Sequence, residues 1–177
     1  MPKIDETIAF QAMNIAVLTV SDTRTEKDDK SGDLIAKMLT DSGHALADKK
    51  IVKDDIPQLQ AQIKSWIDDD NVDVVITTGG TGFTGRDITP EAVKPLYDKE
   101  IEGFSTIFHQ LSYEKVGTST IQSRACGGLT GSTLIFSVPG SPGACKDAWK
   151  GILQYQLDIR HRPCNFVEIM PRFLESK

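Results

Sequence analysis

The hydrophobic positions of this chain fall into two alternating patterns. Short runs of apolar, mostly β-branched residues predict buried strands, and longer stretches in which apolar residues recur about every three or four positions predict amphipathic helices. The strands are expected at 14–20, 45–52, 72–76 and 133–138, and the weaker run at 45–52 is expected at a sheet edge. The helices are expected at 31–42, from Pro57, from Thr89 to a break at Pro95, around 104–111, and after Pro142.

This alternation of strands and helices determines the expected fold class. Most of the predicted strands are continuous apolar runs, which are typical of strands covered on both faces. We therefore expect an α/β fold with three αβα layers around a mostly parallel central sheet. Residues 1–12 are expected to form an extension, and the chain is expected to be irregular from Arg160 onward.

The most informative segment follows the third predicted strand. It reads Thr77-Thr78-Gly79-Gly80-Thr81-Gly82, and it leaves almost no side-chain bulk at the end of a buried strand. Such a loop presents backbone N–H groups to an anion. A helix is expected to begin soon afterwards, with Thr89 as its N-cap and Pro90 as its first residue, and Arg86 and Asp87 lie in between. Together these features predict a phosphate-handling site.

Segment 80–85 also resembles two other nucleotide-binding patterns. It fits G-x-G-x-x-G, but the expected helix begins only after the third glycine, and no predicted strand ends in an acid about twenty residues later. It also approaches a P-loop, but Arg86-Asp87 stands where Lys-Ser/Thr is required. These departures argue against a dinucleotide-dependent oxidoreductase. A tight turn that binds no ligand remains the simple alternative.

Two further polar loops are expected at the same edge of the sheet. Ser21 and Asp22 follow the first strand, and segment 139–143, which includes Gly140 and Ser141, follows the last. Because ligands of parallel sheets bind beyond the carboxyl ends of the strands, these loops are expected to face the glycine loop.

Several charged residues are candidates for the chemistry of this site. Asp54 and Asp87 are candidate carboxylate ligands for Mg²⁺, which needs one or two carboxylates in addition to ligand phosphates. Alternatively, Asp54 or Asp55 only caps the helix at Pro57. Arg124 can grip a phosphate with two hydrogen bonds, or it can form a surface ion pair.

Composition narrows the classes of function. A length of 177 residues fits one domain, and a net charge of −5 leaves no overall basic surface for nucleic acid. The three cysteines (Cys126, Cys145 and Cys164) have no C-x-x-C or zinc-site spacing and are expected to be free thiols. We see no signal peptide and no membrane-spanning run, so a cytoplasmic protein without a membrane partner is expected.

At this point the motifs match a known family. Thr77-Thr78-Gly79-Gly80-Thr81-Gly82, Arg86-Asp87-Ile88-Thr89-Pro90-Glu91-Ala92 and Pro139-Gly140-Ser141-Pro142 occur in this order, and the chain resembles the molybdopterin-binding domain family of molybdenum cofactor biosynthesis. The resemblance covers about residues 13–160, which leaves 161–177 as a C-terminal tail. It implies a homotrimer or a dimer of trimers. It also implies binding of molybdopterin and, in active members, adenylylation of its terminal phosphate by MgATP.

The resemblance also assigns roles to individual residues. Asp54, Asp87 and Ser123 are implied to be catalytic, and the two acids also to hold Mg²⁺. Substrate binding is implied for the three loops and two arginines, namely Ser21, Asp22, Thr78, Gly79, Gly80, Thr81, Gly82, Arg86, Arg124, Gly140 and Ser141. Because adenylyl transfer needs only positioning and charge neutralisation, a few substitutions separate an enzyme from a binder. The alternative function is therefore a non-catalytic molybdopterin carrier or scaffold.

Overall fold

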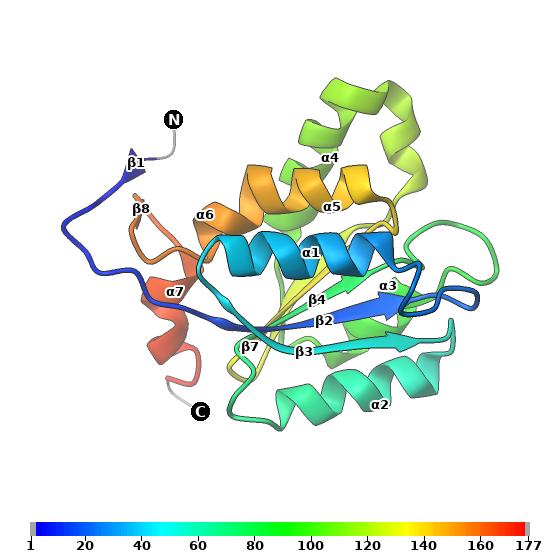
Figure 1. Ribbon diagram of the computed structural model, residues 1–177, viewed down its shortest axis with the longest axis horizontal. Coiled ribbons are helices and arrows are strands. Elements are labelled where there is room, and N and C mark those ends of the chain that lie inside the picture. Colours follow the sequence, from blue (N-terminus) through cyan, green and yellow to red (C-terminus); the bar gives the residue numbers. More distant parts are fainter. Residues whose placement is uncertain (1–2, 176–177) are drawn as a thin grey trace.

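A six-stranded sheet forms the centre of the molecule in the computed structural model, which describes residues 3–175 (Figure 1). The strand order is β3-β2-β4-β7-β6-β5, and the first four strands are parallel. The last two are antiparallel to their neighbours. The bounds are Ala45–Val52 for β3, Asn14–Val20 for β2, Val74–Thr78 for β4, Thr133–Val138 for β7, Cys126–Thr130 for β6 and Lys99–Glu100 for β5.

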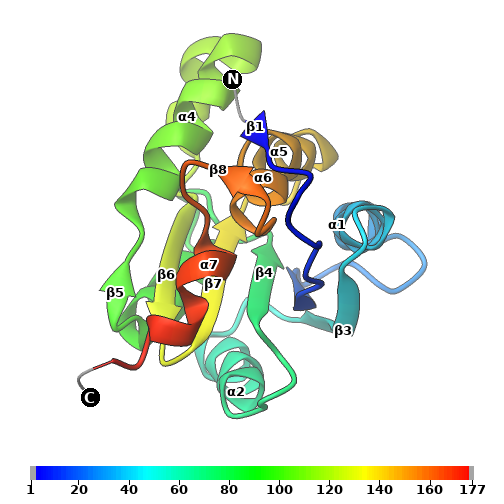
Figure 2. The same ribbon diagram turned by 90° about the vertical axis from the view of Figure 1, so that its left-hand side faces the viewer.

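Helices cover both faces of this sheet (Figures 1 and 2). One face carries α1 (Lys30–Asp41), α4 (Glu102–Val116) and α5 (Pro142–Ala148), and the other carries α2 (Ile56–Ile67) and the short α3 (Thr89–Val93). Successive residues of β2 enter opposite cores, because side chains alternate along a strand. The predicted α/β class with a mostly parallel sheet is confirmed.

The sequence pattern did not predict strand β6. Its segment contains Gly127 and Gly128, which carry no side chain and give no β signal. The structure explains why glycine occupies both positions. A Cβ on Gly128 would lie 2.2 Å from Cγ of Tyr97, and a Cβ on Gly127 would lie 2.9 Å from Cδ1 of Phe136. Aromatic rings therefore occupy the space that side chains of β6 would need.

Two short strands near the ends of the chain pair with each other at the end of the molecule away from the glycine loop (Figures 1 and 2). Strand β1 (Lys3–Ile4) pairs with β8 (His161–Arg162), and α7 (Phe166–Ile169) follows with Asn165 as its N-cap. The segment expected to be irregular therefore contains regular elements, whose partners are distant in sequence. Before it, α5 runs through a π-helical turn (Trp149–Leu153) into α6 (Gln154–Gln156).

Three shorter elements complete the described chain. Single 3₁₀ turns span Lys94–Leu96, where Pro95 interrupts the helix as expected, and Met170–Arg172 after α7. A longer 3₁₀ segment, Gly117–Gln122, follows α4. Within residues 3–175, no helix is both long and apolar enough to cross a membrane.

Candidate functional site

The glycine loop begins where β4 ends, between the carboxyl ends of β2 and β7. The strand runs two residues further than predicted, so Thr77 and Thr78 lie in β4, and the loop begins at Gly79. The Gly79 N–H donates to the carbonyl oxygen of Val138 at 3.0 Å. Hydrogen bonding to the next strand thus fixes where the loop leaves the sheet.

Thr89 supports the loop and is not the cap of α3. Its hydroxyl donates to the carbonyl oxygen of Gly79 at 2.8 Å, and its N–H donates to that of Gly80 at 2.9 Å. The N-cap position belongs to Ile88, whose side chain makes no capping bond. The predicted N-cap was wrong by one residue because the Thr89 hydroxyl bonds to the loop instead of to its own helix.

The loop conformation leaves two backbone donors without a partner. Gly79 and Gly80 have φ angles of 105° and 64°, in the region that favours glycine. In the described part of the chain, the N–H groups of Gly80 and Thr81 have no hydrogen-bond partner. Unpaired N–H groups at a strand end are suited to bind an anion.

An open cleft of about 470 Å³ lies beside this loop, and we call it the glycine-loop cleft. It brings together most of the predicted site residues: Ser21, Asp54, Gly79, Gly80, Thr81, Gly82, Arg86, Asp87, Ser123 and Gly140. Eight of them come from the three polar loops after β2, β4 and β7, whereas Asp54 follows β3 and Ser123 precedes β6. The remaining predicted residues (Asp22, Thr78, Arg124 and Ser141) do not line it.

Three of these remaining residues have structural partners. The Asp22 carboxylate accepts two hydrogen bonds from the Arg86 guanidinium at 2.8 and 2.6 Å. The Thr78 hydroxyl is buried and donates to the carbonyl oxygen of Pro139 at 3.1 Å. The Ser141 hydroxyl caps α5 by accepting from the N–H of Ala144 at 3.2 Å.

Arg124 anchors the far side of the glycine loop. Its guanidinium donates to the carbonyl oxygens of Gly82 and Asp87 at 2.8 and 2.9 Å, and it pairs with Glu91. It also lies over the Phe83 ring, 5.2 Å from the ring centroid. These contacts place the charge of Arg124 against the protein backbone, where it holds the loop in shape.

Arg24 lines the cleft, although the sequence did not mark it as a site residue. Its guanidinium donates to the carbonyl oxygen of Gly140 at 2.6 Å and to the Ser31 hydroxyl. The carboxylate of Asp29, which is fully buried, lies 3.9 Å from Nη1 of Arg24. The sequence signal that could have marked Arg24 was its position in the polar loop after β2. The direction of its side chain, however, depends on contacts with α1 and with the loop after β7.

The structure separates the roles of the adjacent acids Asp54 and Asp55. Asp55 caps α2 by accepting from the N–H of Gln58 at 3.0 Å, whereas Asp54 lines the cleft. Partial burial raises the pKa of the Asp54 carboxyl, and the nearby Asp22 charge raises it further. At Asp87, burial acts to raise the pKa, but hydrogen bonds from the hydroxyl and N–H of Thr84 reverse this and lower it.

These shifts predict how Asp54 affects stability. Because folding raises its pKa, the folded protein binds this proton more tightly than the unfolded chain does. The stabilising contribution is complete below the ordinary pKa of 3.8 and is lost as the pH rises through the higher folded-state value. Asp54→Asn should therefore raise the melting temperature at pH 7, and this gain should disappear below about pH 4. Thermal melts of both proteins in chelator across this range test the prediction, and an equal difference at all pH values would contradict it.

The cleft offers two carboxylates for a cation, Asp54 and Asp87. Within residues 3–175, no group of three or more His, Cys, Asp or Glu side chains could form a complete metal site. This donor set fits Mg²⁺ that arrives with a nucleotide, because Mg²⁺ takes one or two protein carboxylates together with phosphate oxygens and water.

Ser123 lines both the glycine-loop cleft and a second cavity of about 730 Å³. Its hydroxyl is buried and has no hydrogen-bond partner within the described residues. The second cavity is lined mainly by α3 and the 3₁₀ turn after it, by α4, and by the segment that leads into β6, including Glu91, Lys94, His109 and Arg124. An unpaired buried hydroxyl costs free energy, which a ligand group beside Ser123 would recover.

Comparison with known proteins identifies the family. Residues 16–159 match the family described as "Probable molybdopterin binding domain". The chain belongs to this family. The glycine loop, Asp54, Asp87 and Ser123 all fall within the matched residues, so the cleft lies in the family's domain.

Individual relatives agree with this assignment. Molybdenum cofactor biosynthesis protein B of Escherichia coli K12 is 50% identical over 157 residues, which cover 89% of this chain and 92% of that protein. A crystal structure of a molybdenum cofactor biosynthesis protein B superposes with a TM-score of 0.85 at 39% identity, covering 94% of this chain and 98% of the other. The tungsten cofactor synthesizing protein MoaB from Pyrococcus furiosus gives a TM-score of 0.74 at 40% identity, over 82% and 92% of the two chains. The predicted family membership is confirmed.

Proposed function

We propose that this chain acts in molybdenum cofactor biosynthesis by binding molybdopterin in the glycine-loop cleft and adenylylating its terminal phosphate with MgATP. One observation supports the proposal: Gly80 and Thr81, whose N–H groups are unpaired within the described residues, line the same cleft as Asp54 and Asp87. Amide donors suit a phosphate, and the acids suit the cation that accompanies a nucleotide.

The proposed reaction needs no nucleophile from the protein. An oxygen of the molybdopterin phosphate attacks the α-phosphorus of ATP, a new P–O–P bond forms, and the bond to the β-phosphate oxygen breaks to release pyrophosphate. The protein lowers the barrier by holding the two phosphates in line and by neutralising charge. Mg²⁺, held through Asp54 and Asp87, supplies part of that neutralisation.

Four cleft residues have further roles in this scheme. The N–H groups of Gly80 and Thr81 bind phosphate oxygens, and Arg24 adds a positive charge on the side of Gly140. Ser123 donates a hydrogen bond where it lines both cavities. The two cavities that share Ser123 measure about 470 and 730 Å³, and we propose that each receives one of the two substrates.

Assembly of several copies forms part of the proposal. Large apolar side chains are exposed at the outer end of α4 and on the 3₁₀ segment after it, where Tyr113, Val116 and Ile121 are 59%, 53% and 70% exposed. This end projects from the body of the molecule (Figure 1). Exposed apolar surface of this kind favours a contact with another copy, as in the homotrimer or dimer of trimers implied by the resemblance. We place the assembled protein in the cytoplasm.

Release of pyrophosphate tests the enzymatic part. The purified protein is incubated with molybdopterin, ATP and magnesium, and pyrophosphate is measured over time; we expect steady release that requires all three components. Binding of molybdopterin is measured separately. If molybdopterin binds but no pyrophosphate is released above background, the chain is a non-catalytic carrier or scaffold of the same pathway.

A further inference from the structure

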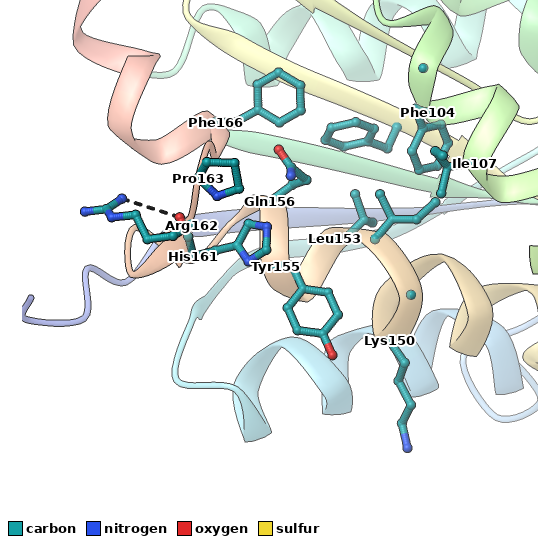
Figure 3. Close-up of a pocket in the computed structure, with 14 residues that line it drawn as sticks. Phe104, Ile107, Lys150, Leu153, Tyr155, Gln156, His161, Arg162, Pro163 and Phe166 are labelled. Atoms are coloured by element: carbon teal, nitrogen blue, oxygen red, sulfur yellow. Dashed lines mark hydrogen bonds between the residues drawn. The ribbon is translucent and has the colours of Figure 1, made fainter. Parts of the chain in front are cut away.

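Another cavity of the described chain lies away from the glycine-loop cleft. It measures about 790 Å³ and shares no lining residue with that cleft. We call it the distal cavity; α4, β7, the α5–α6 helix, β8 and the start of α7 surround it (Figure 3). Its volume falls in the range of small-molecule sites, about 300–1,000 Å³.

Aromatic side chains form one wall of the distal cavity. Phe104, Phe136 and Phe166 come from three different elements, and their ring centroids are 4.9 Å (Phe104–Phe136) and 6.1 Å (Phe136–Phe166) apart. Figure 3 shows Phe104 and Phe166 at the two ends of this wall, with Leu153 and Ile107 near Phe104. Phe104 and Phe136 are themselves buried, at 3% and 1% exposed, so the partly buried Phe166 is the ring of this wall that can offer an aromatic surface to a ligand.

One buried polar group in this wall lacks a partner. His161 lines the cavity and is only 9% exposed, and its Nδ1 atom makes no hydrogen bond within the described residues. Leaving such an atom unpaired costs about 1–3 kcal/mol, whereas a ligand group at hydrogen-bond distance would remove this cost. The side chain of Gln156 lies beside His161 in Figure 3 and adds an amide to the same region.

The charges around the cavity have one sign. Lys150 and Arg162 line it, and no Asp or Glu among the described residues does so, although the whole chain carries a net charge of −5. Arg162 pairs with Glu168 at 3.3 Å, whereas Lys150 has no ion-pair partner within residues 3–175. The Lys150 ammonium extends outward from the helix in Figure 3, and its flexible stem can reach an anion at the mouth.

We propose that the distal cavity binds a small aromatic acid. The flat ring system lies against Phe166 and the exposed side chain of Ile107, a polar group pairs with Nδ1 of His161, and a single negative charge faces Lys150 at the mouth. This site is independent of the proposed adenylyl transfer, since the two cavities have no residue in common.

A fluorescent probe with this chemistry tests the proposal. We expect 8-anilinonaphthalene-1-sulfonate to bind the wild-type protein with one saturable site per chain and increased emission. Gly103→Leu should weaken binding about tenfold or more, because the glycine lines the cavity and its Cβ position is open to 4 Å. Gly143→Leu is the matched control, since it is also the second residue of a helix, has equally open space, and lies outside the cavity.

Two further variants separate the polar contacts from simple partition into an apolar space. Lys150→Glu should weaken binding of the sulfonate probe but not binding of its uncharged analogue N-phenyl-1-naphthylamine. Lys146→Glu, on the same helical segment, should change the binding of neither probe. His161→Phe keeps an aromatic ring but removes both nitrogens, so it should also weaken binding of the sulfonate probe. Circular dichroism confirms that each variant is folded.

Three outcomes would overturn the proposal. These are no saturable binding to the wild-type protein, equal binding by the Gly103→Leu and Gly143→Leu variants, or stronger binding after His161→Phe. A change of oligomeric state caused by Gly103→Leu alone, measured by light scattering, would instead assign this surface to a contact between copies. Because adding ATP or pyrophosphate should not displace the probe, failure here is distinguishable from failure of the proposed reaction.

Discussion

Asp87→Asn should lower the rate of pyrophosphate release on the order of 100-fold while leaving molybdopterin affinity nearly unchanged. The substitution removes a negative charge that lines the glycine-loop cleft beside Asp54. It preserves the size of the side chain, and an amide oxygen can still accept the bonds from Thr84 that measure 2.9 and 2.7 Å in the parent. The effect should therefore appear in turnover and in the dependence on magnesium concentration.

Asp70→Asn is the matched control for this prediction. It makes the same change of charge at an exposed acid between α2 and β4, at the opposite end of β4 from the glycine loop. Turnover, molybdopterin affinity and melting temperature are measured for all three proteins. If Asp87 only stabilises its loop, Asp87→Asn should lower stability by about 1 kcal/mol and leave turnover unchanged, and this result would exclude the catalytic role.

Gly80→Ala should abolish or strongly weaken phosphate binding in a protein that still folds. Gly80 has a φ angle of 64°, and an added Cβ would lie 2.5 Å from Oγ1 of Thr89 and 3.1 Å from Oδ1 of Asp54. The Thr89 hydroxyl is bonded to the carbonyl oxygen of Gly79 and cannot move aside without breaking that contact. The loop must therefore change its conformation, and its N–H groups lose their common direction. We expect the affinity for pyrophosphate, measured by calorimetry, to fall at least about tenfold.

Two other glycines of the loop sharpen this test. Gly85→Ala should bind pyrophosphate as the parent does, because its Cβ would meet nothing within 4 Å and its φ is not positive. At Gly82 a Cβ would lie 2.7 Å from Oδ2 of Asp87, so Gly82→Ala should weaken binding with less strain on the backbone. Equal affinity in Gly80→Ala and Gly85→Ala would show that the loop does not hold the anion.

The hydrophobic pattern was sufficient to predict most helices and strands. Apolar residues recur about every 3.6 positions along a half-buried helix, and they form short continuous runs in a strand that is buried on both faces. β2 and β7 have the predicted bounds, and α1 and α2 differ by about one residue from the expected helices. The pattern failed at β6, whose glycines accommodate Tyr97 and Phe136 from other parts of the chain. It also failed in the C-terminal tail, where β8 is a strand only because β1 lies beside it.

Some features of the candidate site could likewise be predicted from the sequence, and others could not. The sequence alone indicated the α/β class, the glycine loop and three polar loops at one edge of the sheet, because these follow from strand order and backbone chemistry. Only the tertiary structure decided that Asp54 faces the cleft while Asp55 caps a helix, that Arg24 lines the cleft, and that Arg124 holds the loop. The direction of a charged side chain depends on hydrogen-bond partners far away in sequence, such as Gly140 for Arg24 and Gly82 for Arg124, and packing alone brings these partners within reach.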